Sequence, residues 1–122
     1  MLTEMAENHH EHLPRLSPNF KLWLEHDGKY VFGPGAYALI KSIHTSGSIT
    51  EAAKEQRMSY RYAWGVIKKI ESVLDAKIIE SYKGGNKGGG GAVVTEYGQS
   101  LMALYERVNH SFSNIINSLE PV

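Results

Sequence analysis

The sequence predicts a single domain of the α+β class, in which four helices are combined with two β-hairpins. Helix signals recur in three consecutive short segments between residues 36 and 74. Extended segments flank an Asp-Gly pair near the start of the chain and a glycine-rich loop near residue 87. A long apolar repeat follows over residues 96–119, and the length of 122 residues suits one such domain.

Composition excludes several classes of protein. The chain has no cysteine, which excludes a disulfide scaffold, a cysteine-ligated zinc site and a thiol nucleophile. No apolar run approaches the roughly 20 residues that cross a bilayer, and the first residues lack the pattern of a signal peptide. We therefore expect a cytoplasmic protein without a membrane partner.

The charge of the chain is unevenly distributed. The whole sequence is formally neutral, with 13 basic and 13 acidic side chains. Residues 54–87, however, carry eight basic and four acidic side chains, a local charge of +4, while residues 1–30 and 88–122 each carry −2. A clustered basic surface attracts phosphates whatever the overall sum. The middle of the chain is thus the expected contact region for an anionic partner.

The N-terminal part is expected to hold a tail and a hairpin. Residues 1–17 show no sustained period and predict a mobile tail, in which His9, His10 and His12 are interpreted as solvated rather than as a metal site. Residues 20–25 and 29–32 predict two strands around the Asp-Gly turn. We expect neither a metal nor another cofactor.

Three helices are predicted next. The first has apolar residues at 36, 39, 40 and 43 and ends near Gly47. The second begins with the capping-box pair Ser48 and Glu51. The third runs over residues 59–74, and its predicted buried stripe is Ala63, Ile67, Ile70 and Leu74.

A glycine-rich ribbon and a long helix complete the prediction. Residues 77–83 and 92–95 predict two strands joined by the glycine loop, and Thr95 is placed to cap a helix over residues 96–119. The apolar residues of that helix recur at nearly heptad spacing. They are Tyr97, Leu101, Leu104, Val108, Phe112, Ile115 and Leu119.

This order of elements is typical of a winged helix-turn-helix, here with an N-terminal β-hairpin and a long C-terminal dimerisation helix. In such folds the third helix enters the major groove of double-stranded DNA. We expect residues 18–95 to form the DNA-binding domain and residues 96–122 the dimerisation helix. The expected DNA-binding residues are Ser59, Tyr60, Arg61, Trp64, Lys68, Lys83, Asn86 and Lys87.

These residue types suit DNA for different reasons. The guanidinium of Arg61 matches the two acceptors on the major-groove edge of guanine, whereas the lysines suit phosphates. Trp64 and Tyr62 are equally well interpreted as packing residues, and Ser59 as a helix cap. Lys69 is the least favoured of the basic residues because it is placed to face away from the groove.

The glycine loop raises the alternative of a nucleotide-binding enzyme. Gly84 and Gly89 have the glycine spacing of a phosphate-binding loop, but Gly90 and Gly91 stand where Lys and Ser or Thr are required. The loop also leads into a strand rather than a helix, so the anion-binding helix end is missing. Since no catalytic set of residues emerges elsewhere, we expect the chain not to be an enzyme.

The last helix is expected to join two copies of the chain. A helix of this length extends roughly 36 Å, whereas a compact domain of this size has a radius of gyration of only about 14 Å. One protomer can therefore hardly cover the whole repeat, and burial against a twofold mate is the simplest solution. We expect the dimer contact at Tyr97, Leu101, Leu104, Val108, Phe112 and Ile115. The alternative is a core helix packed on its own hairpin.

Four segments together resemble a known family. They are 45–53, Met58-Ser-Tyr-Arg-Tyr-Ala-Trp64, the glycine loop 83–92, and Thr95-Glu-Tyr-Gly98. They resemble the DNA-binding domain of the molybdate-responsive regulators, the ModE family, which are relatives of LysR-type regulators in this domain. The resemblance covers about residues 20–115. It implies a winged-helix dimer held by long helices, with 59–64 on the recognition helix and 83–91 in the wing.

The resemblance does not extend to molybdate. The resemblance implies that full-length family members hold their molybdate site in a separate C-terminal domain. No position of this chain matches an oxyanion site. We expect a homodimeric, sequence-specific transcriptional regulator that binds a pseudo-palindromic site, with any effector sensed by a separate partner. The alternative is a protein-interaction module that uses the same fold without specific DNA binding.

Overall fold

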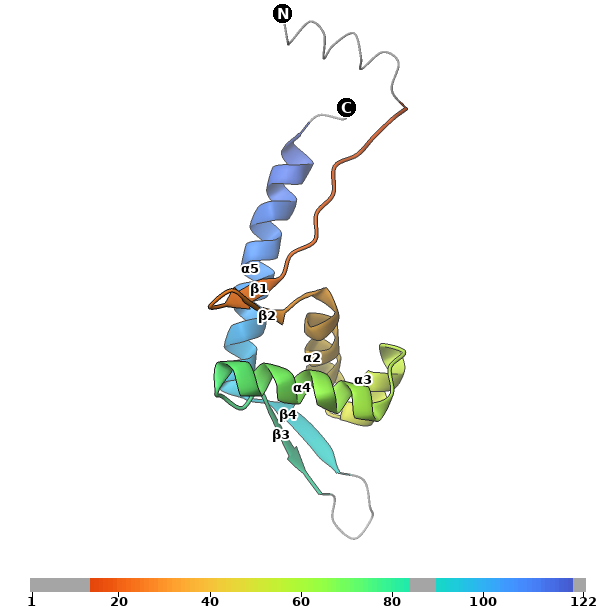
Figure 1. Ribbon diagram of the computed structural model, residues 1–122. Coiled ribbons are helices and arrows are strands. Elements are labelled where there is room, and N and C mark those ends of the chain that lie inside the picture. Colours follow the sequence, from red (N-terminus) through yellow and green to blue (C-terminus); the bar gives the residue numbers. More distant parts are fainter. Residues whose placement is uncertain (1–13, 84–89, 120–122) are drawn as a thin grey trace, which may run out of the picture.

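The computed structural model describes residues 14–83 and 90–119, and within them it confirms the α+β class (Figure 1). Four helices are combined with two separate two-stranded antiparallel sheets. In chain order the elements are β1 (Leu24–His26), β2 (Lys29–Phe32), α2 (Pro34–Ser46), α3 (Ile49–Glu55), α4 (Tyr60–Leu74), β3 (Ile79–Tyr82), β4 (Gly91–Val94) and α5 (Glu96–Ser118).

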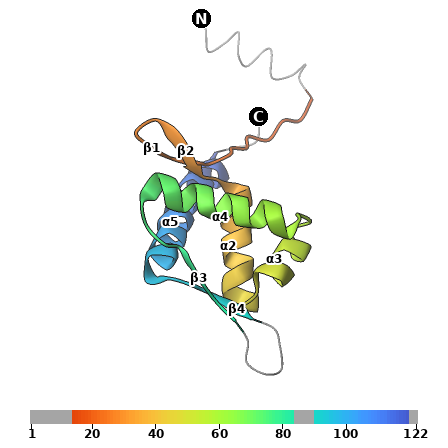
Figure 2. The same cartoon turned by 60° about the horizontal axis from the view of Figure 1, so that its bottom comes forward.

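The elements form a compact head from which two parts project in opposite directions. Helices α2, α3 and α4 make the head, and α4 crosses in front of α2 with α3 beside its first turn (Figure 2). The β3–β4 hairpin projects from one end of the head, and the C-terminal half of α5 projects from the other (Figure 1). Among the described residues, no helix is both long and apolar enough to cross a membrane.

Local capping signals set the helix starts as predicted. The side chain of Ser48 accepts a hydrogen bond from the Glu51 amide at 3.1 Å, and that of Ser59 accepts one from the Tyr62 amide at 3.0 Å. Thr95 caps α5 in the same way through Gly98. Gly47 ends α2 with a φ of 70°, a left-handed conformation that favours glycine. These contacts confirm the three predicted helix starts.

The core lies where α2, α3, α4 and the two hairpins meet. Leu39, Ile40 and Ile43 on α2 are buried, as are the small residues Ala52 and Ala53 that let α3 approach closely. On α4 the predicted stripe is confirmed at its first three positions, whereas Leu74 is half-buried at the helix end. The fully buried large side chains are Phe32, Leu39, Ile40, Ile43, Ile67, Ile78 and Ile79.

The first hairpin is shorter than predicted. Pairing covers only Leu24 to His26 against β2, with an irregularity between Leu24 and Glu25. The expected strand over residues 20–23 is wrong, because β2 has four residues and offers no further partner. That segment runs instead alongside α5, where the ring of Phe20 lies 5.7 Å from the ring of Phe112 (Figure 1).

The β3–β4 hairpin is attached to the head by backbone hydrogen bonds and one carboxylate. The amide of Ala92 donates to the carbonyl of Gly47 at the end of α2. The side chain of Glu71, on α4, accepts hydrogen bonds from the amides of Ile78 at 2.8 Å and Ile79 at 3.3 Å. The recognition-helix candidate α4 and the hairpin are therefore held in a fixed relation.

Glu71 gives a first testable expectation. Burial raises its pKa, but the hydrogen bonds from Ile78 and Ile79 and the Lys68 ammonium outweigh burial, so the pKa is lowered. A carboxyl with a lowered folded-state pKa stabilises the fold above its ordinary pKa, and this contribution is lost as the pH falls through the lowered value. We expect Glu71→Gln to reduce the free energy of unfolding at pH 7 by about 1–2 kcal/mol.

Thermal unfolding at pH 7 and about pH 3 checks this expectation. The difference between the unmodified protein and Glu71→Gln should narrow at the lower pH. Glu80→Gln, on the exposed part of β3, is the matched control and should change little at either pH. A Glu71→Gln deficit of equal size at both pH values would contradict a role for the ionised carboxylate.

Helix α5 packs on the head through residues that differ from its apolar repeat. Gly98, Met102 and Tyr105 are its buried residues. A Cβ atom at Gly98 would lie 2.6 Å from the carbonyl oxygen of Ile78, so this contact requires glycine. Gly98, Met102 and Tyr105 face the core, and the predicted apolar repeat lies on the neighbouring side of the helix.

Aromatic side chains strengthen the contact between α2 and α5. The rings of Tyr37 and Tyr105 stack with centroids 5.0 Å apart, and Phe32 meets Tyr105 edge-on at 5.5 Å. The hydroxyl of Tyr37 donates a hydrogen bond to the carboxylate of Glu106. Burial and the Glu106 carboxylate raise the pKa of Tyr37 to about 12, so the hydroxyl remains a donor at neutral pH.

Candidate DNA-binding surface

The outer face of α4 is a narrow exposed surface with two cations. Ala63, Ile67 and Ile70 point into the core. Successive helical residues are about 100° apart, which places Arg61 and Gly65 on the opposite side, with Lys68 next to them. All three are exposed. We call this surface the outer face of α4.

The flank of α4 nearest the β3–β4 hairpin is held by side-chain contacts. The Lys68 ammonium lies 3.3 Å from the Glu71 carboxylate and 5.0 Å from the centre of the Trp64 ring. Trp64 also meets the ring of Tyr60 at 6.2 Å and packs against the core. Trp64 is thus a half-buried platform that supports Lys68, which accords with the packing interpretation of this residue.

The opposite flank of α4 belongs to a different surface. Tyr62, 62% exposed, and Lys69 line a groove of about 280 Å³ together with Tyr30 from β2. This groove lies between α4, α2 and the first hairpin. The structure therefore separates Tyr62 and Lys69 from the predicted DNA-binding residues, as the sequence predicted for Lys69.

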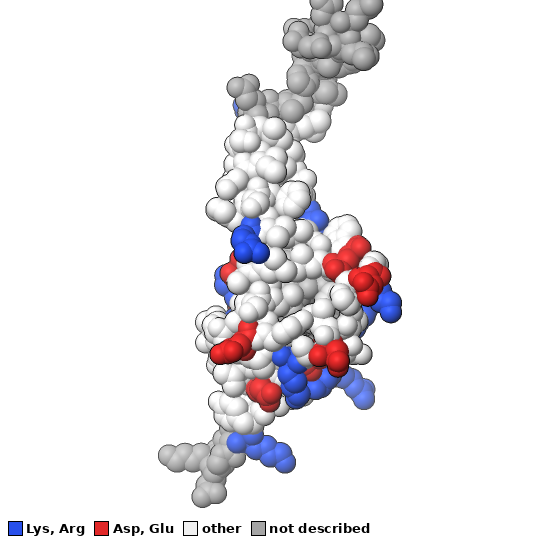
Figure 3. All heavy atoms as spheres, turned by 90° about the vertical axis from the view of Figure 1, so that its left-hand side faces the viewer, with Lys and Arg blue, Asp and Glu red and all other residues white. Residues whose placement is uncertain are grey.

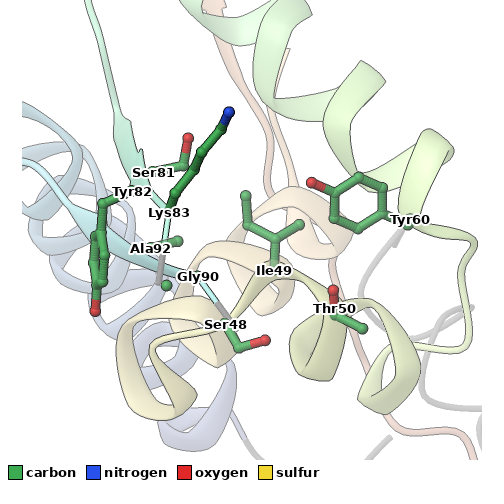
Figure 4. A pocket seen from close by; sticks show the side chains of 10 residues that line it. Ser48, Ile49, Thr50, Tyr60, Ser81, Tyr82, Lys83, Gly90 and Ala92 are labelled. Atoms are coloured by element: carbon green, nitrogen blue, oxygen red, sulfur yellow. The ribbon is translucent and has the colours of Figure 1, made fainter. Parts of the chain in front are cut away.

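A cleft of about 610 Å³ lies between the start of α4, the start of α3 and the β3–β4 hairpin. Tyr60 and Lys83 extend from opposite walls of the cleft, and Ser48 and Thr50 lie at its floor (Figure 4). Ser81 on β3 completes the polar lining. The cleft is open, and besides Ile49, Ala92 and two glycines its lining carries hydroxyl groups and one ammonium group, which are groups that bind phosphate oxygens.

Besides Trp64, the predicted DNA-binding residues lie at different places in the structure. Arg61 and Lys68 lie on or beside the outer face of α4, and Tyr60 and Lys83 line the cleft. Ser59 caps α4 with its side-chain oxygen and is exposed. Asn86 and Lys87, predicted for the wing, lie outside the described residues, as do His9, His10 and His12.

Sequence reasoning missed Ser48, Thr50 and Ser81 as part of this surface. Ser48 was assigned only its capping role, and the other two carry no motif. Their position in the cleft depends on the packing of α3 beside a hairpin that is about 30 residues away in the sequence. Within the described ranges, no group of His, Cys, Asp and Glu side chains is arranged to hold a metal ion.

A second exposed surface lies on α5. Tyr97, Leu104, Phe112 and Ile115 are between 40% and 56% exposed, although all four are large and apolar or aromatic. Leu101 packs partly on the core and Phe112 touches Phe20, so the chain covers its own repeat only in part. Viewed from the left of Figure 1, the projecting C-terminal half of α5 is mostly uncharged, whereas charged side chains gather on the head (Figure 3).

The chain is similar to bacterial transcriptional regulators. The DNA-binding transcriptional dual regulator ModE of Escherichia coli K12 is 41% identical over 85 residues, which make up 70% of this chain and 32% of the relative. The transcriptional regulator ModE of Yersinia pestis is 41% identical over 73 residues, 60% of this chain and 27% of the relative.

A further relative has a different name. The molybdenum-pterin-binding protein MopB of Rhodobacter capsulatus is 35% identical over 88 residues, 72% of this chain and 32% of the relative. The chain thus spans about a third of the length of these curated relatives. No family model matches the chain. The similarities confirm the resemblance to ModE that the sequence motifs indicated.

Proposed function

We propose that the chain is a sequence-specific DNA-binding transcriptional regulator of the winged helix-turn-helix type. In this proposal α3 and α4 are the helix-turn-helix, α4 is the recognition helix and the β3–β4 hairpin is the wing. Residues 18–95 form the DNA-binding domain, residues 1–17 a separate tail, and residues 96–122 the dimerisation helix. The protein acts in the cytoplasm on double-stranded DNA and is not an enzyme.

One observation carries the proposal. The exposed outer face of α4, with Arg61 at its first turn, adjoins an open cleft that carries hydroxyl groups and the Lys83 ammonium and is bounded on the far side by the β3–β4 hairpin. A helix in the major groove needs such a face toward the bases, and the adjacent sugar–phosphate strand needs a polar channel beside it. The similarity to ModE supports the same function.

The residues divide into two roles in this proposal. Arg61 reads a base edge, because its planar guanidinium can donate two hydrogen bonds to guanine. Tyr60, Ser48 and Lys83 hold phosphates in the cleft, which positions the helix without selecting a sequence. Trp64 keeps the Lys68 ammonium beside the outer face of α4, where it can reach a phosphate.

A homodimer through α5 accounts for the exposed apolar face of that helix. The helix has 23 residues and extends about 35 Å. Contiguous exposed apolar patches on a protein often mark interaction sites. A twofold pair would place two recognition helices in successive major grooves about 34 Å apart, which requires a pseudo-palindromic site.

Selection of duplexes from a random-sequence pool tests the proposal. The unmodified protein should enrich a pseudo-palindromic motif, and its affinity for the enriched duplex should exceed that for a random duplex by at least about 10³-fold at physiological salt. For both duplexes, the logarithm of the binding constant should fall linearly with the logarithm of the salt concentration. Equal affinity for both duplexes would contradict sequence-specific regulation, and an absence of salt-dependent binding would favour the protein-interaction module.

A further inference from the structure

Gly65 stands at an energetically unfavourable place in α4. It is the sixth residue of a fifteen-residue helix, far from both ends. Glycine in a helix interior costs about 0.5–1 kcal/mol relative to alanine, because it loses more backbone freedom on folding. A residue that reduces stability at such a position calls for a physical reason.

Contacts within the part of the chain that the structure describes supply no such reason. A Cβ atom built at Gly65 meets no atom within 4 Å among the described residues, and the backbone there is helical. Gly98 and Gly47 differ, because a Cβ at Gly98 would collide with Ile78 and Gly47 has a left-handed backbone. Alanine at position 65 would therefore fit the free protein and favour its helix.

The surroundings of Gly65 indicate what would need the space. On the outer face of α4, Arg61 precedes it by one helical turn and Lys68 follows it by one turn, and both are exposed. Gly65 is thus a gap in the outer face of α4 with long basic side chains before and after it. Such a gap lets a partner touch the helix main chain while the side chains reach past it to a polyanion.

We propose that Gly65 is the point of closest approach between α4 and the floor of the DNA major groove. This inference rests on the proposed function and adds a residue to it. The missing side chain lets the helix axis lie deeper in the groove, so that Arg61 reaches a base edge and Lys68 a phosphate. Glycine at position 65 exchanges some stability of the free protein for this fit.

Two substitutions at Gly65 test the inference, with the duplex enriched by the unmodified protein as the probe. Gly65→Ala should raise Tm by about 2–6 °C, through the better helix propensity. The same variant should bind the enriched duplex about 3–10-fold more weakly, and Gly65→Leu at least about 30-fold more weakly, because each added carbon holds the helix further from the bases.

Gly35→Ala is the matched control. Gly35 lies in the first turn of α2, its Cβ position is also open, and it borders the groove of Tyr62 rather than the outer face of α4. We expect unchanged affinity for the enriched duplex from this variant. Unchanged or tighter binding by both Gly65 variants would overturn the inference.

The test also separates this inference from the proposed function. If the unmodified protein enriches no sequence, the proposed function itself fails and the inference fails with it. If it enriches a motif whose binding requires Arg61 and tolerates leucine at position 65, only the inference fails. A loss of affinity accompanied by a lower Tm in both Gly65 variants would indicate damage to the helix and would also overturn it.

Discussion

Arg61→Ala is expected to lower affinity for the enriched duplex by about 10–100-fold, while affinity for a random duplex falls much less. A good bidentate contact to a base is worth about 1–3 kcal/mol, and about 1.4 kcal/mol corresponds to a tenfold change. Arg61 is exposed in the first turn of α4, and its removal opens no cavity in the core. Fluorescence anisotropy with both duplexes measures the two affinities.

Two further variants separate base reading from phosphate binding. Lys83→Ala should weaken binding to both duplexes by a similar factor and reduce the salt slope by about one, because it removes a phosphate contact from the cleft. Lys69→Ala removes an exposed cation from the other flank of α4 and should change both affinities little. An equal loss on both duplexes from Arg61→Ala would contradict a base-reading role.

Leu104→Glu is expected to convert the protein from a dimer to a monomer and to lower affinity for the enriched duplex by about 10²–10⁴-fold. Leu104 is 40% exposed and lies in the middle of the apolar repeat of α5. A carboxylate there would be buried without a partner in a twofold helix pair. Loss of the second half-site contact then removes the gain from two linked domains.

Ala103→Glu provides the matched control for the dimer. Ala103 is the preceding residue of α5, is exposed, and lies on a side of the helix away from the repeat. Light scattering should report a dimeric mass for the unmodified protein and for Ala103→Glu, and about half that mass for Leu104→Glu. The dimer proposal does not survive if the unmodified protein is already a monomer or if Leu104→Glu keeps the dimeric mass.

The Leu104→Glu prediction requires that a substitution on the exposed side of α5 leaves the fold of the head, and with it the outer face of α4, unchanged. The contact between α5 and the head is made by Met102, Tyr105 and Glu106, by Tyr37 of α2, and by Leu101 as the one repeat residue packed on the described core, and Leu104 is not among them. A monomeric Leu104→Glu variant should therefore keep its fold. Circular dichroism and thermal unfolding of that variant would verify that the loss of DNA binding comes from the loss of the second copy.

Much of the fold could be predicted because the signals are local. Ser48, Ser59 and Thr95 each cap a helix through a hydrogen bond to an amide three residues later, so the sequence neighbourhood alone defines the helix start. The turn at Asp27 and Gly28 has positive φ at both residues, as its composition indicates. The apolar positions of α4 and the length of α5 follow from the helical period in the same way.

The sequence predicted the candidate site on α4 and at Lys83, but not the rest of the cleft. Arg61 and Lys68 share one helix, and their common exposure follows from the angle between helical residues. The cleft has walls from three elements, so neither Thr50 nor Ser81 could be assigned to it before the packing was known. Glu71 fixes the start of β3 by accepting a hydrogen bond from the Ile78 amide, seven residues later in the sequence, and this contact likewise follows only from the packing.

The sequence by itself determined the order and bounds of most elements, the outer face of α4 and the exposed repeat of α5. Tertiary structure alone decided the cleft, the side of α5 that enters the core, and the course of residues 20–23 along α5 instead of in a strand. The reason is physical. Caps, turns and helical periods are set by residues within one or two turns of each other, whereas these contacts depend on which surfaces remain available after the helices have packed.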